Sequence, residues 1–127
     1  MTGYELYLIA LDICGLRNSL GEEDEDLNDL KSRSLSLINL LLDETLWLER
    51  HLKNDSTIKT VHLNALEEEL SVDTLISGCV LPFGLAAMLI ADEAPDFSVS
   101  LYNRYKLNTA IVQRSFISKR HPIEEMY

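Results

Sequence analysis

The chain has 127 residues, enough for one ordinary domain and too few for two, so we expect a single domain over residues 1–127. Hydrophobic residues make up 46% and charged residues 25%, which argues against a mainly disordered chain, and the formal net charge of −10 disfavours general nucleic-acid binding because lysine and arginine bind phosphate. Five glycines and three prolines are too few for an all-β chain rich in tight turns, and we predict an all-α fold.

The first predicted helix spans about Thr2–Cys14. Thr2 and Glu5 have the spacing of a capping box, in which the hydroxyl and the carboxylate satisfy two open amides. Gly15 provides the stop, since glycine enters the left-handed conformation at little cost. Residues 17–26 form a polar linker with five consecutive acids, which we expect to be mostly loop. These acids lack the alternating pattern of a calcium loop and are interpreted as a solvated segment before the next helix.

The longest predicted helix spans about Leu27–Lys53 and has an unusually wide apolar face. Two neighbouring leucine-rich stripes run along it at three- and four-residue spacing. A small monomer usually buries one such stripe, and two indicate burial against the chain's own core and against another chain. A central helix of a bundle would show the same pattern, so both interpretations stay open. The stripe residues that we predict to lie in an interface are Leu30, Leu37, Leu41 and Leu48.

Two more helices are predicted in the second half of the chain. Residues 58–70 are the least helical, and the spacing of apolar residues from Ile58 to Leu63 suits an extended segment or one short strand. A third helix spans about Val72–Asp92, and Pro82 should kink or split it because proline lacks a backbone donor. A fourth helix spans about Asp96–Ser118, followed by an irregular tail over residues 121–127. The expected subunit therefore has four helices, a long second one and a Pro-kinked third.

Targeting and redox signals are sparse. The start of the chain lacks the basic residues and apolar run of a signal peptide. The longest uncharged run, Leu75–Ala91, falls short of the roughly 20 apolar residues of a membrane span, so we interpret it as a buried helix. Cys14 and Cys79 make no disulfide framework and lie in apolar stretches, and we predict that both are reduced and buried.

Charge is distributed unevenly. The stretch Ser98–His121 carries +5 and no acidic residue, so the remainder carries −15. These cations could pair with acids elsewhere in the same molecule, or a basic surface could meet an acidic surface of a neighbouring subunit. Such complementarity speeds and orients association more than it tightens it. For the second interpretation, the predicted interface residues are Arg104, Lys106 and Arg114.

No pattern of residues indicates catalysis. The three histidines are scattered, none at a metal-ligand spacing from another histidine or from a cysteine. The chain has no nucleophile elbow, phosphate loop or dinucleotide-binding glycine motif. The adjacent acids Asp43–Glu44 and Asp92–Glu93 should diverge on a helix and are interpreted as solvated surface. We therefore expect no catalytic residues, no metal and no cofactor.

Five stretches of the sequence carry a resemblance to known proteins. They are Tyr4–Gly15, Asn28–Asn39, Val80–Glu93, Tyr102–Tyr105 together with Phe97, and Ile123–Tyr127. The first two resemble the short first helix and the start of the long second helix of small phage and prophage head–tail connector (adaptor) proteins. The next two resemble the last helical pair of that family, and the closing one resembles a terminus seen in such prophage proteins.

The resemblance implies an all-α structural subunit of a homo-oligomeric ring, commonly of about a dozen copies. The ring would dock on the portal, carry tail or stopper proteins below it, and extend the DNA conduit. DNA would pass through the lumen without specific binding, and an acidic lumen would let it slide. It implies assembly in the cytoplasm of a bacterial host and a place in the virion neck if the phage is active, with no membrane contact.

Two other functions compete with this one. The chain could be an acidic helical protein-interaction module, such as a prophage-encoded regulator or inhibitor that binds a basic partner. It could also be an enzyme with a carboxylate-bound metal, which would need acids that converge in one pocket. The acids lie in separate runs along the sequence, which argues against the enzyme.

Overall fold

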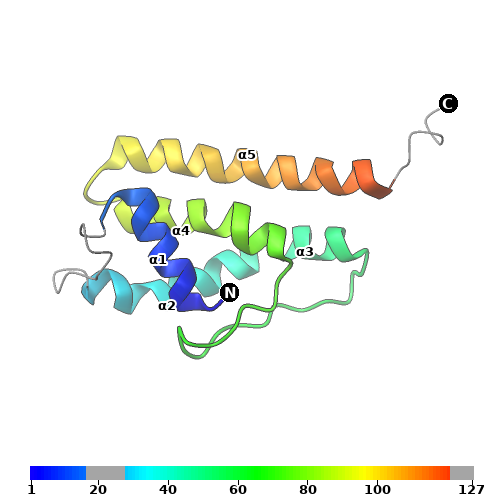
Figure 1. The fold of residues 1–127 in the computed structure, drawn as a ribbon, viewed down its shortest axis with the longest axis horizontal. Coiled ribbons are helices and arrows are strands. Elements are labelled where there is room, and N and C mark those ends of the chain that lie inside the picture. Colours follow the sequence, from blue (N-terminus) through cyan, green and yellow to red (C-terminus); the bar gives the residue numbers. More distant parts are fainter. Residues whose placement is uncertain (17–27, 121–127) are drawn as a thin grey trace.

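The computed structural model describes residues 1–16 and 28–120, with only the backbone described for residues 116–120. Its helices are α1 (Gly3–Cys14), α2 (Asn28–Glu44), α3 (Leu46–Lys53), the π-helical η2 (Ile76–Val80), α4 (Leu81–Ile90) and α5 (Pro95–Arg120), as Figure 1 shows. The described residues form no strand, only an isolated bridge between Thr2 and Glu69. This confirms the predicted all-α class. The acidic linker, Leu27 and the predicted irregular tail lie outside the described residues.

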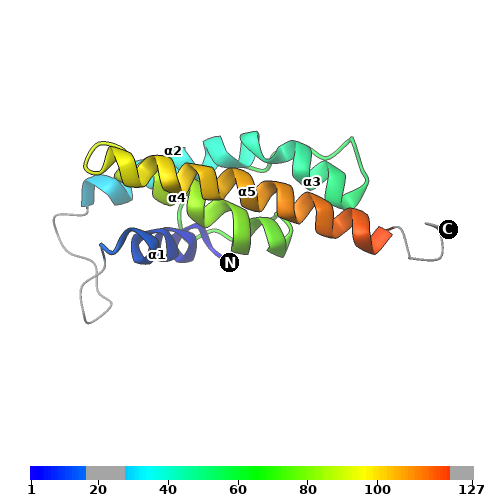
Figure 2. The ribbon, with the colours of Figure 1, turned by 90° about the horizontal axis from the view of Figure 1, so that it is seen from above.

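Helix α4 is the centre of the structure. Figures 1 and 2 show α5 lying antiparallel along α4, with α1 on one flank of α4 and α2 on the other, and α4 contacts all three. A helix that is apolar on every side belongs in a core, and most of α4 is buried. Gly84 permits the close approach of its neighbours, because a Cβ there would lie 2.9 Å from Leu41 Cδ2 and 3.0 Å from Tyr105 Cδ1.

The first helix forms as predicted. Thr2 Oγ1 accepts a hydrogen bond from the Glu5 amide at 3.0 Å, and the Thr2 amide donates to Glu5 Oε1 at 3.3 Å. Gly15 ends the helix with φ of 72°. These local contacts position the buried side of α1 against α4.

The predicted continuous helix from Leu27 to Lys53 is wrong. Helix α2 ends at Glu44, and α3 begins at Leu46 after Thr45, whose φ of −98° and ψ of 5° depart from helical values. The Thr45 hydroxyl is buried and donates to the carbonyl of Leu41 at 2.8 Å. Such a bond to the preceding turn often bends a helix, but Ser34 and Thr109 form the same bond within the unbroken α2 and α5, so the bond alone does not set the break. The described chain consequently has five α-helices and one π-helix instead of the four predicted helices.

The predicted proline kink is also wrong. Pro82 lies in the first turn of α4, where its missing amide and fixed φ are tolerated. The irregularity lies before it, in η2, where the backbone widens into a π-helix over Ile76–Val80. The predicted third helix therefore corresponds to two elements. The predicted fourth helix agrees with α5 within two residues at each end.

The long connection between α3 and η2 crosses the surface without pairing as a strand. Side chains of α2 and α3 hold it instead. Asn39 Nδ2 donates to the Leu63 carbonyl at 2.9 Å, and Asn39 Oδ1 accepts from the Leu63 amide at 2.8 Å. Arg50 Nε donates to the Ile58 carbonyl at 2.8 Å. The expected extended segment near Ile58–Leu63 is thus present, but it joins no sheet.

The two cysteines have different environments, and neither is in a disulfide. Cys14 is half-buried, and its thiol donates a hydrogen bond to the Ala86 carbonyl at 3.4 Å. Cys79 is exposed in η2. The prediction that both thiols are buried is therefore wrong for Cys79, because the π-helix directs that position outward.

Candidate interaction surface

Helix α5 directs one narrow stripe of side chains into the core. Tyr105 and Asn108 add polar contacts to this stripe: the Tyr105 hydroxyl donates to Glu44 Oε1 at 3.4 Å, and Asn108 Nδ2 donates to the Cys79 carbonyl at 2.7 Å. Burial raises the pKa of Tyr105, so its hydroxyl remains a donor. The buried positions recur every three or four residues and are Leu101, Tyr105, Asn108 and Val112.

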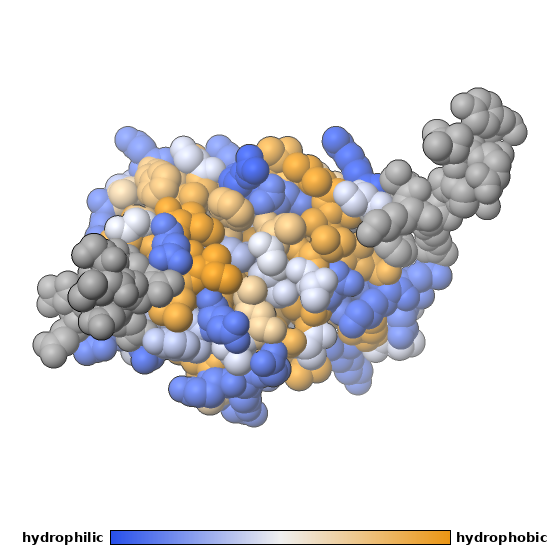
Figure 3. Space-filling view, in the orientation of Figure 1, coloured by the Kyte–Doolittle hydropathy of each residue, from blue (hydrophilic) through white to orange (hydrophobic). Residues whose placement is uncertain are grey.

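The remaining surface of α5 exposes several large apolar side chains. Val99 is 60% exposed, Leu107 50%, Ile111 46% and Tyr102 44%. Figure 3 shows orange hydrophobic atoms among blue charged ones along the upper edge of the molecule, where α5 runs in Figure 1. One exposed leucine needs no explanation, but four large apolar residues on one helix form a surface suited to contact with another chain.

Cations lie among these apolar residues. Arg104, Lys106 and Arg114 are exposed, and none of them forms an ion pair with a carboxylate that the structure describes. The Arg104 guanidinium lies 5.8 Å from the centre of the Phe83 ring, and Lys106 Nζ lies 5.5 Å from that of Tyr102. The interpretation that these cations pair within the molecule therefore fails for the described residues. Arg104 lines the hollow beside η2 and Lys106 lines the hollow beside Trp47, so these two cations lie on different flanks of α5. We call the three cations and the exposed apolar residues of α5, on both flanks, the outer face of α5.

A groove runs along one flank of the outer face. It has a volume of about 470 Å3 and lies between η2 and α5. Phe83 and Ile111 give it apolar walls, Arg104 lies at its side, and the exposed Cys79 lines it from η2. A smaller hollow of about 200 Å3 lies where α5 meets Trp47. Large aromatic and arginine side chains of this kind carry most of the binding energy in many protein interfaces.

The N-terminal end of α5 is acidic. Asp92 and Glu93 occupy the turn between α4 and α5, and Asp96 lies in the first turn of α5. All three are exposed, and none pairs with a cation that the structure describes. We call these residues the acidic turn. The expectation that Asp92 and Glu93 are surface residues is confirmed.

The structure divides the predicted interface residues into two groups. Leu30, Leu41 and Leu48 are at most 8% exposed, and α2 and α3 bury them in the core of the single chain. This is a correction, because side chains already covered by the chain itself offer no surface to another copy. Leu37 is half-buried and packs at the edge of the core.

The predicted cations, by contrast, are all at the surface. The apolar residues beside them were not among the predicted interface residues, although Leu107 and Ile111 are four residues apart on one side of α5. Leu40 and Trp47, at 49% and 47% exposure, are the outward residues of α2 and α3. Leu41, the residue next to Leu40, is also a leucine and is buried. The periodicity of apolar residues alone could therefore not distinguish the exposed Leu40 from the buried Leu41.

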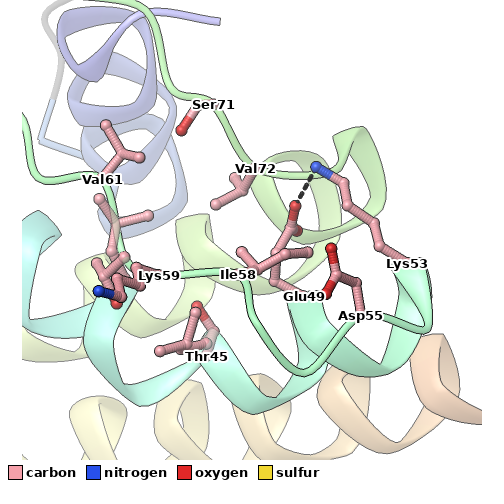
Figure 4. A pocket seen from close by; sticks show the side chains of 12 residues that line it. Thr45, Glu49, Lys53, Asp55, Ile58, Lys59, Val61, Ser71 and Val72 are labelled. Atoms are coloured by element: carbon pink, nitrogen blue, oxygen red, sulfur yellow. Dashed lines mark ion pairs between the residues drawn. The ribbon is translucent and has the colours of Figure 1, made fainter.

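A second hollow lies beneath the connection between α3 and η2 and has a volume of about 400 Å3. Figure 4 shows Glu49 pointing from α3 toward Lys53, beside Ile58 and Val72 of the connection. Glu49 is only 4% exposed, forms an ion pair with Lys53, and accepts a hydrogen bond from the Asp73 amide at 2.9 Å. The hydrogen bond to Glu49 raises the pKa of Lys53. Both oxygens of the buried carboxylate are engaged, and the arrangement holds the connection in place.

The described residues show neither a group of three or more potential metal ligands nor a helix long and apolar enough to traverse a lipid bilayer. His62 lies 2.9 Å from Asp43 Oδ1, and His121 falls outside the described residues. No family model matches the chain, and comparison with curated proteins and with solved structures finds no match either.

Proposed function

We propose that this chain is a structural subunit that assembles with copies of itself through the outer face of α5, as part of a phage head–tail connector ring. In this role the ring docks on the portal, carries tail or stopper proteins, and extends a conduit through which DNA passes without specific binding. The observation that carries the proposal is that Arg104, Lys106 and Arg114 lack carboxylate partners in the described chain and lie among exposed apolar residues.

The chemistry of this surface suits binding. Arginine and aromatic side chains are enriched at protein interfaces, and apolar contacts there supply the driving force while charges fix orientation. The core does not need these residues, because the inward stripe of α5 already packs against α4. An assembly role explains both the apolar and the charged part of the outer face.

The test is the mass of the wild-type protein and of the double variant Arg104→Glu/Lys106→Glu across a concentration and salt series, measured by sedimentation velocity. The wild type should form species larger than a dimer, alone or with portal protein added. The variant should assemble less at the same concentration. Circular dichroism of both proteins controls for folding.

A wild type that stays monomeric at high concentration, with and without portal protein, would overturn the proposal. A stable monomer or dimer that instead binds a basic protein would favour the acidic interaction module. The high negative charge of the whole chain is the feature that suits such a module.

A further inference from the structure

We propose that the acidic turn of one copy docks on the outer face of α5 of the next copy, so that the subunits associate head to tail. The inference rests on the proposed function, because it names the surface that receives each neighbour. Its two halves are the cations Arg104, Lys106 and Arg114 and the carboxylates of Asp92, Glu93 and Asp96.

The two charge sets cannot satisfy each other within one molecule. Asp96 lies on the same straight helix as the cations, eight residues or about 12 Å from Arg104 and eighteen residues or about 27 Å from Arg114 at 1.5 Å per residue. At ~0.15 M salt, exposed charges act over about 8 Å. The structure accordingly shows no ion pair between the two sets in the described chain. A second copy can supply the opposite charge to each of the two sets.

Helix stability accounts for only part of the acidic turn. Asp96 lies in the first turn of α5, where a negative charge interacts favourably with the helix dipole. Asp92 and Glu93 lie between the end of α4, where the helix dipole disfavours carboxylates, and the start of α5 at Pro95, where it favours them. The dipoles therefore do not account for Asp92, which lies nearer to the end of α4, and a docking role does.

A second copy of the chain fits both halves at once. A nucleic acid would neutralise the cations but would be repelled by the carboxylates and by the overall charge of −10. Another copy offers carboxylates to the cations and cations to the carboxylates, while Leu107 and Ile111 provide apolar area beside the charges. A contact between two different patches of identical chains closes into a ring or continues as a filament, and it uses each patch once per subunit.

Charge exchange tests the pairing directly. The acidic-turn variant is Asp92→Lys/Glu93→Lys, and the outer-face variant is Arg104→Glu/Lys106→Glu. Each should weaken self-association by at least about tenfold at low salt, since every attractive pair becomes repulsive. A 1:1 mixture of the two variants should restore assembly, because each then offers the charge that the other needs. The control for the acidic-turn variant is Glu67→Lys, which reverses an exposed carboxylate that has no ion pair in the described chain and should assemble like the wild type.

Sedimentation velocity and mass photometry read the result. Restored assemblies larger than a dimer, containing both variants in equal number, support the head-to-tail contact. A mixture that stops at a 1:1 dimer overturns it, because that product is made by two antiparallel α5 helices. If the outer-face variant assembles less than the wild type but the acidic-turn variant assembles equally well, the pairing is wrong while the proposed function survives. A wild type that never assembles removes the proposed function itself.

The folding of each variant is checked by circular dichroism. If a charge-reversal variant unfolds, the neutral versions Asp92→Asn/Glu93→Gln and Arg104→Gln/Lys106→Gln replace it. Each neutral variant should assemble less than the wild type and lose most of the salt dependence of assembly. A salt dependence equal to that of the wild type in both would overturn the pairing.

Discussion

Helices α4 and α5 are consecutive in sequence and lie against each other, yet they play different parts in the structure. Helix α4 is short and mostly buried, with α1, α2 and α5 around it. Helix α5 is much longer and buries one narrow stripe, while its outer face combines exposed apolar residues with cations that have no carboxylate partner in the described chain. Packing in the core explains the apolar residues of α4. It does not explain the exposed apolar residues and cations on the outer face of α5.

The strongest test of this contrast compares two leucines. Leu85 of α4 is fully buried and Leu107 of α5 is 50% exposed. Leu85→Ala should lower the free energy of unfolding by about 2–5 kcal/mol, because it leaves a cavity in the core. Leu107→Ala should change it by no more than about 0.5 kcal/mol. Urea denaturation at a protein concentration that favours the monomer measures both, and equal losses would contradict the assignment of α5's outer face to binding.

A pair of glycines gives the next largest effect. A Cβ at Gly84 would lie 2.9 Å from Leu41 and 3.0 Å from Tyr105, whereas a Cβ at Gly78 would meet no atom within 4 Å. Gly84→Ala should therefore cost about 1–3 kcal/mol by forcing α2 and α5 away from α4. Gly78→Ala should be neutral or stabilising by up to about 1 kcal/mol, because alanine is the better helix former. Thermal unfolding followed by circular dichroism distinguishes them, and a neutral Gly84→Ala would show that the three helices are packed less closely.

The connection between α3 and η2 is held by the side chain of Glu49 more than by packing against the core. Glu49→Gln keeps the shape of the residue but removes the ion pair with Lys53, and we expect a loss of about 1–2 kcal/mol because the carboxylate is buried. Amide hydrogen exchange should speed up over residues 54–73. Glu67→Gln changes an exposed carboxylate of the same connection and is the control. Unchanged exchange in Glu49→Gln would mean that Asn39 and Arg50 suffice to hold the segment.

Much of the fold follows from local sequence, and the failures share a physical cause. The capping box of Thr2 and the glycine stop at Gly15 are local contacts, so α1 could be predicted closely. No glycine or proline marks the break at Thr45, and a threonine inside an apolar pattern does not reveal it. The π-helix before Pro82 contacts α5, which is distant in sequence, and local sequence does not show that contact.

The candidate surface was predictable only in its charged part. Long cationic side chains such as Arg104 and Lys106 almost never lie fully buried, so their sequence positions already indicate surface. Apolar periodicity shows that one side of a helix is hydrophobic, but it does not show what covers that side. For this reason Leu41 and Leu48 were predicted to be interface residues, although α4 and its neighbours cover them. The exposed Leu107 and Ile111 were not predicted to lie in the interface.

The smallest effect concerns the two thiols, one beside α4 and the other facing α5. Cys14 is half-buried, and this burial raises its pKa from an ordinary 9.0 to about 11, whereas Cys79 is exposed. Because the thiolate is the reactive form, iodoacetamide at pH 8 should modify Cys79 readily and Cys14 slowly. Mass spectrometry of the intact protein should show one rapid addition, which Cys79→Ser abolishes. Two equally rapid additions would contradict the burial of Cys14.

The raised pKa of Cys14 also fixes how its contribution to stability changes with pH. The folded state keeps this thiol neutral above the pH at which the unfolded chain ionises it, so the stabilisation is fully present below about pH 9 and is lost as the pH rises through about 11. Urea denaturation of the wild type between pH 8 and pH 11 should show this loss, and Cys14→Ala should lack that part of the pH dependence. Cys79→Ser should keep it, because this variant leaves the half-buried Cys14 in place. A pH dependence that disappears in Cys79→Ser and persists in Cys14→Ala would reverse the assignment of the two environments.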